Sequence, residues 1–321
     1  MCGLAGVVIK QKNRSKSELG EIQNLVSELL CAAEVRGSHA SGMAIVDRDG
    51  AYLIHKKPMA ATDMVRTEEF GSALDLIDKN TGAAICHTRF ATQGSPKINK
   101  NNHPLRAGTV IGTHNGWVSN DDELFDKYSL KRFAKVDSEV LFRMIDSADT
   151  PETFYKDMLK NVSGKVSMVW ADIEFPEYVY MYKGNNPLHM VYLEAYEIFA
   201  YASTAAILNE ALKWSGMQLA TRKGMSFTDW TAIRINTKTG EIKKTKNVKL
   251  DIPVYKYNTA WNAGYLGNRY TDAVTAKQPN TTKYGGTVAG FVPRYSWREK
   301  LAADGSTIKT ANVNGKKKGD K

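Results

Sequence analysis

The chain begins Met1-Cys2-Gly3, so removal of the initiator methionine leaves a cysteine at the mature N-terminus. Aminopeptidases remove methionine readily before a small residue, and Cys2 then carries both a thiol and a free α-amine. Because an α-amine titrates at about 7.7–8.0, a fraction of it is uncharged near neutral pH and can accept the thiol proton. Cys2 would therefore combine a nucleophile and its general base in one residue.

Three further segments carry polar residues beside apolar runs. They are residues 36–42 (RGSHASG), 87–94 (HTRFATQG) and 112–117 (GTHNGW), and Asp137-Ser138-Glu139 follows the last of them. Together with the start MCGLAGVV, their order and spacing resemble the glutaminase domain of class II glutamine amidotransferases, the Cys-type N-terminal-nucleophile enzymes. The second and third segments are most similar to the glucosamine-6-phosphate synthase branch. The resemblance runs over roughly residues 2–240.

This resemblance implies a role for each residue that matches the family pattern. Cys2 is the expected nucleophile, and the side-chain amide of Asn115 with the backbone N–H of Gly116 is the expected oxyanion hole. Such donors are typically worth a few kcal/mol each in the barrier. Arg89 matches the residue that grips the substrate α-carboxylate, and Asp137 matches the one that receives its α-ammonium. The remaining substrate-binding residues that the resemblance implies are Arg36, Thr92 and Gly94.

Simpler explanations exist for the same residues. Asn115-Gly116 is also a common turn sequence, Arg89 could be an ordinary surface arginine at a strand end, and Asp137 could cap a helix. The chain also departs from the family at three positions: His39 stands in place of an Asp, Phe90 in place of a Trp and Gln93 in place of a His. None of the three is the nucleophile, the oxyanion hole or a charged clamp.

Hydrophobic periodicity defines the elements that must position these residues. It predicts an α+β fold, and the resemblance specifies a four-layer αββα sandwich of the N-terminal-nucleophile hydrolase type. The Asp49-Gly50 pair predicts a hairpin. The predicted helices are 17–35, 137–145, 151–159 and about 204–214. The predicted strands are 7–10, 43–46, 52–55, 83–89, 109–113, 166–171, 178–182, 189–192, 198–202 and 231–236.

The composition changes after about residue 250. We divide the chain into a glutaminase domain, residues 2–250, and a basic, largely irregular tail, residues 251–321, with twelve Lys/Arg against five Asp/Glu. The net charge of +10 therefore belongs mostly to the tail. Its aromatic residues could stack on a partner or on single-stranded nucleic acid, although packing on the domain is the favoured interpretation. These aromatics are Tyr265, Tyr270, Tyr284, Phe291, Tyr295 and Trp297.

Several classes of protein are disfavoured. Three cysteines at unrelated spacings favour neither a disulfide framework nor a zinc site, and Cys31 and Cys86 are expected to be small buried residues. The histidines have no metal-ligand spacing, so we expect no metal and no cofactor. No apolar stretch has the length of a membrane helix and no signal pattern is present, so we expect a cytoplasmic protein.

The leading hypothesis is a stand-alone glutaminase. It would hydrolyse the side-chain amide of L-glutamine to glutamate and ammonia through a thioester on Cys2. Residues 241–321 lack a phosphate loop and a βαβ rhythm, so a separate partner protein is expected to accept the ammonia. Two alternatives stay open: a hydrolase of another γ-glutamyl amide, and a catalytically silent binding protein that uses its basic tail.

Overall fold

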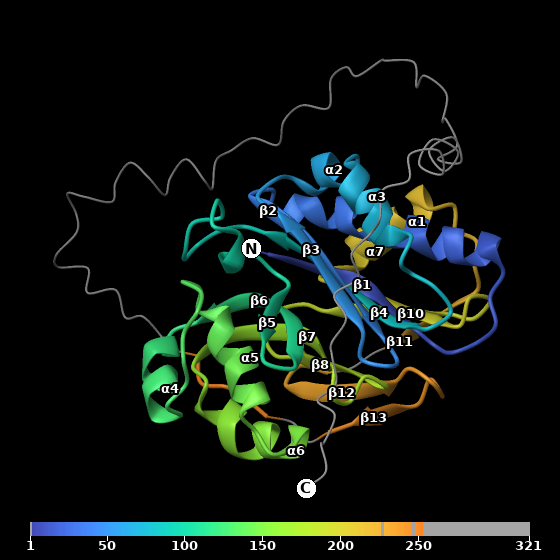
Figure 1. Cartoon of the computed structure of the whole chain (residues 1–321). Helices are drawn as coiled ribbons and strands as arrows, with labels where there is room; N and C mark the ends of the chain where they lie inside the picture. Colours follow the sequence, from blue (N-terminus) through green and yellow to red (C-terminus); the bar gives the residue numbers. More distant parts are fainter. Residues whose placement is uncertain (1, 226–227, 246–247, 253–321) are drawn as a thin grey trace, which may run out of the picture. The chain divides into compact units, whose positions relative to one another are not determined.

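Two β-sheets packed face to face form the centre of the molecule, with helices on both outer faces (Figure 1). This computed structural model describes residues 2–225, 228–245 and 248–252. All strand pairs within the two sheets are antiparallel. The predicted four-layer αββα sandwich is confirmed.

The first sheet, in the described part of the chain, has seven strands in the order β11-β9-β10-β1-β4-β2-β3. They are β1 (Gly3–Ile9), β2 (Ala40–Asp47), β3 (Tyr52–Lys57), β4 (Thr81–Arg89), β9 (His189–Leu193), β10 (Ile198–Ala202) and β11 (Arg222–Met225). Strand β1 lies at the centre, and all of its residues are buried because the sheet is covered on both faces. The N-terminal strand is thus an interior strand.

The second sheet has the order β13-β12-β8-β7-β6-β5 within the described residues. Its strands are β5 (Leu105–Ala107), β6 (Val110–Val118), β7 (Gly164–Asp172), β8 (Tyr178–Lys183), β12 (Thr231–Asn236) and β13 (Ile242–Lys244). Strand β6 pairs with β7 along its whole length, so that Asn115 lies opposite Ser167 and Gly116 opposite Val166.

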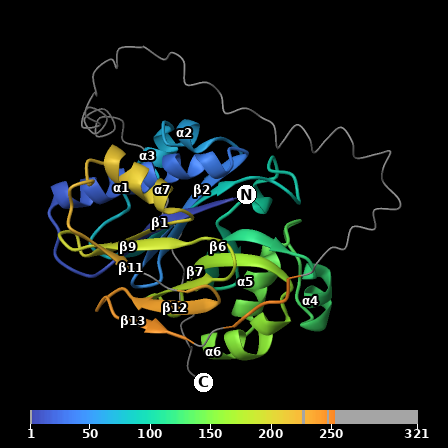
Figure 2. The same ribbon diagram turned by 180° about the vertical axis from the view of Figure 1, so that it is seen from behind.

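Helices cover the outer face of each sheet, as the two opposite views show (Figures 1 and 2). On the first sheet lie α1 (Lys16–Ala33), α2 (Ala61–Met64), α3 (Glu68–Leu74) and α7 (Ala205–Trp214). On the second lie α4 (Asp121–Lys127), α5 (Ser138–Asp146) and α6 (Pro151–Thr153). Three hydrophobic clusters separate the four layers, one under each helical layer and one between the sheets.

Local sequence explains where the main helices begin. The Ser15 hydroxyl accepts a hydrogen bond from the backbone N–H of Glu18 at the start of α1, and Thr204 caps α7 in the same way. One apolar side of α1, including Ile22, Leu25 and Leu29, is buried against the sheet.

The structure also corrects several expectations. Strand β1 begins at Gly3 and not at residue 7, because Gly3 already pairs with Thr88 of β4. The helix expected over 151–159 is divided into α6, a π turn (Phe154–Met158) and a 3₁₀ turn (Leu159–Asn161). The short elements α2, α3, α4, β5, β11 and β13 were not predicted, because each is too short for a periodic pattern. Of the expected irregular tail, residues 251–321, only Asp251 and Ile252 are described, and Asp251 forms a β-bridge with Ser163; the rest lies outside the described residues.

Candidate active site

Cys2 lies immediately before β1, at the end of the sheet where β1 begins and β4 ends. Because β1 and β4 are antiparallel, the start of one meets the end of the other, and the Cys2 Sγ lies 3.6 Å from the backbone oxygen of Phe90. In both views the start of β1 lies beside the teal segment that follows β4 (Figures 1 and 2). The fold therefore brings Cys2 to Arg89, 87 positions along the chain.

Backbone contacts fix the position of Cys2. The Nε of Arg36 donates a hydrogen bond of 3.1 Å to the Cys2 backbone oxygen. Two residues after Cys2, the N–H of Leu4 donates to Ser203 Oγ, and the N–H of Ser203 donates to the Leu4 oxygen, both at 2.8 Å. Arg36, expected as a substrate-binding residue, therefore holds the backbone of the candidate nucleophile.

The electrostatic environment does not by itself produce a thiolate. Burial raises the pKa of the Cys2 thiol, and the charge of Asp137 adds slightly to this. The contact with the Phe90 backbone oxygen, the amino terminus and Arg89 lower the pKa, but the net shift is upward. Formation of a thiolate at Cys2 would thus require a base. Of the other two cysteines, Cys86 is fully buried as expected, and burial raises the pKa of its thiol, whereas Cys31 is only half-buried, contrary to expectation.

Asn115 and Gly116 lie within strand β6 on the opposite sheet. The explanation as a turn is therefore wrong, because the β6–β7 pairing continues to Val118. The sequence pattern missed this part of the strand, since Asn and Gly are rare in strands. Gly116 has a φ of 144°, and a Cβ there would lie 1.7 Å from the backbone oxygen of Lys165. The backbone at Gly116 thus requires glycine.

The side chain of Asn115 is fully buried, and neither atom of its amide has a hydrogen-bond partner in the described part of the structure. Its backbone oxygen is held by Asn186, whose Nδ2 donates at 2.8 Å. Leaving a buried amide unpaired costs about 1–3 kcal/mol, so such groups are uncommon away from functional sites. The hydrogen-bonding capacity of the Asn115 amide is thus unused by the described residues.

Arg89 is 3% exposed and its guanidinium is held by three oxygens. Nη1 donates to Asn102 Oδ1 at 2.7 Å, and Nη2 donates to the backbone oxygens of Gln93 and Gly94 at 2.5 and 2.8 Å. Arg89 is therefore an ordered, buried arginine and not an ordinary surface residue. Burial lowers its pKa, and the charges of Cys2 and Asp137 raise it.

Asp137 is 8% exposed and immediately precedes α5. Its side chain does not cap this helix. Instead, Oδ2 accepts a 2.8 Å hydrogen bond from the backbone N–H of Val118, at the end of β6. Asp137 is thus tied to the strand that carries Asn115, and it interacts electrostatically with both Cys2 and Arg89.

The loop that follows β4 contains the other two expected substrate-binding residues. Thr92 is exposed, and Gly94, with a φ of 72°, packs against the backbone oxygen of Lys135. Two of the family departures contact each other beside this loop. The His39 ring stacks on Phe90 with a centroid distance of 5.1 Å, and His39 Nδ1 accepts the N–H of Ala91 at 2.9 Å.

Two polar residues of the site were not anticipated from sequence. Asn102, which binds Arg89, is fully buried, and the Nζ of Lys56 donates to the backbone oxygens of Asn102 and Pro104 at 2.7 and 2.9 Å. The positions of both side chains are set by a long-range contact between β3, which carries Lys56, and the loop after β4, which carries Asn102. The run Asn101-Asn102-His103-Pro104 is the only local signal that could have directed attention to this loop.

Three buried histidines lie beneath the site. His87 Nε2 is 3.1 Å from the backbone oxygen of His114, and the His87 and His103 rings stack at 4.2 Å. Burial lowers the pKa of His87 to about 3 and lowers those of His103 and His114 as well. They are therefore neutral at physiological pH and suit a structural role.

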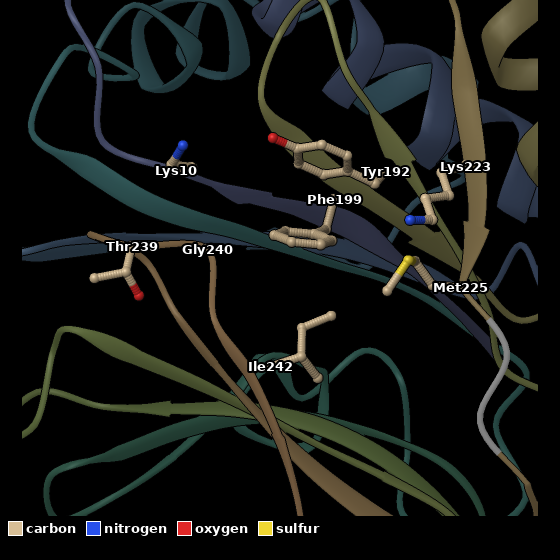
Figure 3. A pocket seen from close by; sticks show the side chains of 8 residues that line it. All are labelled: Lys10, Tyr192, Phe199, Lys223, Met225, Thr239, Gly240 and Ile242. Atoms are coloured by element: carbon tan, nitrogen blue, oxygen red, sulfur yellow. The ribbon is translucent and has the colours of Figure 1, made fainter.

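A cavity of about 220 Å³ lies at the opposite end of β1 (Figure 3). Lys10, which follows β1, lines it and forms a 2.5 Å ion pair with Glu197. At about 3.3 Å per residue, the length of β1 separates this cavity from Cys2 by roughly 25 Å. Its other lining residues are Tyr192, Phe199, Lys223, Met225, Thr239, Gly240 and Ile242, and none is a candidate reactive residue.

Searches of the described residues for two further features gave negative results. No group of three or more His, Cys, Asp or Glu side chains in that part of the chain is arranged to hold a metal ion. None of the helices described there combines the length and hydrophobicity that a membrane crossing requires.

Comparison with curated proteins identifies two groups of similar enzymes, whereas no family model matches the chain. A 7-cyano-7-deazaguanine synthase of Saccharolobus solfataricus is 28% identical over 211 residues, which cover 63% of this chain and 43% of that protein. A glutamine–fructose-6-phosphate aminotransferase (isomerizing) of Vibrio parahaemolyticus is 24% identical over 247 residues, covering 73% of this chain and 38% of that protein. The chain thus spans less than half the length of these relatives.

Comparison with solved structures supports the fold. Glutamine phosphoribosylpyrophosphate amidotransferase from B. subtilis matches with a TM-score of 0.57 and 18% identity, over 76% of this chain and 49% of that one. The resemblance to class II glutamine amidotransferases is confirmed by these relatives. The 7-cyano-7-deazaguanine synthases, however, were not anticipated from the motifs.

Proposed function

We propose that residues 2–250, the region that resembles class II glutamine amidotransferases, hydrolyse the side-chain amide of L-glutamine. The products are L-glutamate and ammonia, formed through a thioester on Cys2. The observation that carries this proposal is the fully buried, unpaired amide of Asn115, on the sheet opposite Cys2 and among the described residues. A group of that kind is suited to stabilising a developing oxyanion.

The reaction would begin after removal of Met1. The α-amine of Cys2 accepts the thiol proton, and Sγ attacks the amide carbon of the substrate. Negative charge then develops on the former carbonyl oxygen, where the Asn115 side chain and the Gly116 N–H donate hydrogen bonds. Collapse of this intermediate transfers the proton to the leaving nitrogen and releases ammonia, and water then cleaves the thioester to give glutamate.

The glutamyl head group would bind between two opposite charges. In this proposal Arg89 binds the α-carboxylate and Asp137 binds the α-ammonium, and both residues are close enough to Cys2 to affect its pKa. Thr92 and Gly94 lie on the loop that supplies oxygens to Arg89, so they would border the substrate. A cation and a carboxylate side by side suit a γ-amide whose α-carboxylate and α-ammonium groups are both free.

The ammonia is proposed to pass to an acceptor outside residues 2–250. The relatives extend well beyond the region that they share with this chain, and their names describe two different products. Similar domains thus occur with different ammonia acceptors, and we propose that a separate partner protein is the acceptor here.

Hydrolysis is tested directly by incubating the purified protein with L-glutamine and measuring glutamate and ammonia. We expect both products in equal amounts, and neither from a Cys2→Ala variant. Cys31→Ala is the matched control, since Cys31, like Cys2, is a partly exposed free cysteine but has no role in the proposed reaction. If the protein hydrolyses another γ-glutamyl amide but not glutamine, this proposal is wrong and the alternative of a hydrolase of another γ-glutamyl amide replaces it.

A further inference from the structure

The guanidinium of Arg89 is oriented by neutral groups. Its three hydrogen bonds to Asn102, Gln93 and Gly94 use three of its five N–H groups, which leaves two for a ligand. Within the described residues it forms no ion pair with Asp137, although the two charges interact. The positive charge of Arg89 therefore stays available, and its direction is set by the three oxygens.

Asn102 is the one side chain among these three acceptors, and it is fixed at both of its ends. Its Nδ2 donates to the backbone oxygen of Pro96 at 2.7 Å, which leaves Oδ1 directed at Arg89. Its own backbone oxygen accepts the 2.7 Å hydrogen bond from Lys56. Because the side chain is fully buried, these contacts are shielded from water.

Lys56 occupies an unfavourable position for a cation. Burial, and then the charge of Arg89, lowers its pKa to about 8. It nevertheless donates to two backbone oxygens, those of Asn102 and Pro104. Gly42 permits the close approach of this segment, since a Cβ there would lie 2.2 Å from the backbone oxygen of His103. Lys56 on β3 and the close approach at Gly42 on β2 thus hold residues 102–104 against the first sheet.

We propose that Asn102, held in place by Lys56, is a positioning residue that aims the two free N–H groups of Arg89 at the substrate α-carboxylate. It determines selectivity for γ-amides that carry an α-carboxylate, and it does not touch the substrate itself. This inference rests on the proposed function for the identity of the head group.

The experiment measures binding and so does not depend on turnover. Three ligands are titrated calorimetrically into the full-length Cys2→Ser protein: L-glutamine, 4-carbamoylbutanoate (glutamine without its α-amine) and 4-aminobutanamide (glutamine without its α-carboxylate). Asn102→Ala is compared with Asn101→Ala. Asn101 is the preceding residue and equally buried: its Nδ2 donates to the backbone oxygen of Ser95 and its Oδ1 accepts from the backbone N–H of Lys135, but within the described structure no hydrogen bond joins it to Arg89.

We expect Asn102→Ala to weaken binding of glutamine and 4-carbamoylbutanoate by about 10-fold, because an Arg89 that is no longer held in position has to be ordered on binding. Binding of 4-aminobutanamide should change by less than about 2-fold. Asn101→Ala should affect the three ligands equally. Lys56→Met should reproduce the selective pattern more weakly, and it provides a second variant if Asn102→Ala does not fold.

Equal losses for all three ligands, or no loss for any, would overturn the inference and leave glutamine hydrolysis standing. If the selective pattern is found but the unmodified protein releases no ammonia from glutamine, the proposed function fails and the positioning role of Asn102 holds. Absence of binding by all three ligands to the Cys2→Ser protein would overturn the positioning role, and ammonia release by the unmodified protein decides the proposed function separately.

Discussion

The Nε2 of His87 lies 3.1 Å from the backbone oxygen of His114 and thereby joins the two sheets beneath the candidate site. His87 is on β4, which ends at Arg89, and His114 is on β6, next to Asn115. A buried polar contact of this kind fixes the position of one sheet relative to the other. The candidate nucleophile and the candidate oxyanion hole are on different sheets, so their alignment depends on it.

The first prediction concerns stability in acid. The pKa of His87 is lowered to about 3 in the folded protein, and an unfolded histidine has a value near 6.5. Between these values the unfolded state binds one more proton, so stability falls as the pH falls from about 6.5 to 3, by about 1.4 kcal/mol per pH unit for this residue. The lowered pKa values of His103 and His114 act in the same direction.

Urea unfolding at a series of pH values measures this dependence. His87→Gln keeps an N–H for the His114 oxygen but cannot titrate, so it should reduce the slope between pH 4 and 6 by about 1.4 kcal/mol per unit. An unchanged slope would show that His87 is protonated in the folded protein.

The second prediction concerns the nucleophile. Cys2→Ser should lower glutamine hydrolysis by several orders of magnitude, because a hydroxyl is much harder to deprotonate than a thiol. A glutamine analogue with a diazo-ketone group should label Cys2 only, as detected by peptide mass spectrometry, and the intact mass should lack Met1. Labelling of Cys31 or Cys86 with Cys2 unmodified would contradict the assignment, as would an active preparation that retains Met1.

The third prediction separates function from stability at Asn115. Asn115→Ala should lower kcat by about 10²–10³, the usual effect of removing one oxyanion donor. It should cost little or no stability, because the amide that it removes is buried without a partner among the described residues. Steady-state kinetics and thermal melting of the same samples test both parts. A large loss of stability together with normal kcat would give Asn115 a purely structural role.

The fourth prediction concerns the two charged residues that would bind the head group. Replacing Arg89 by Met, or Asp137 by Asn, leaves one end of the bound zwitterion unpaired in a partly buried site, at a cost of about 2–5 kcal/mol. KM for glutamine should therefore rise strongly, while kcat falls less than it does for Cys2→Ala. An unchanged KM with a kcat as low as that of Cys2→Ala would contradict the assignment.

The fifth prediction concerns the C-terminal segment. All of the proposed catalytic and substrate-binding residues lie between Cys2 and Asp137, so deleting residues 255–321 should leave glutamine hydrolysis largely intact. Binding to an ammonia-accepting partner should be lost, with a strong dependence on salt because the segment carries twelve cations. Pull-downs across a salt series test this. Loss of hydrolysis on truncation would place the domain boundary beyond residue 250.

Long, regular elements and short reactive motifs were predictable from the sequence, and long-range contacts were not. The helix α1 follows from its apolar periodicity, and the grouping of Cys2, Arg89 and Asp137 follows from the family resemblance. The oxygens that orient Arg89 could not be predicted, because two of them are backbone atoms and the third, on Asn102, depends on Lys56 from another strand. The strand at Asn115-Gly116 was missed because pairing with β7 overrides local propensity.

The central place of β1 in its sheet also determines when the site can form during synthesis. One neighbour of β1 is β10, so the strand is completed only after the ribosome has made residues up to about 202. Its other neighbour is β4, so until about residue 89 has been made Cys2 is part of an unpaired N-terminal segment, accessible to the aminopeptidase that our proposal requires. Folding then encloses the processed end between two strands, so that maturation of the nucleophile precedes assembly of the pocket that uses it.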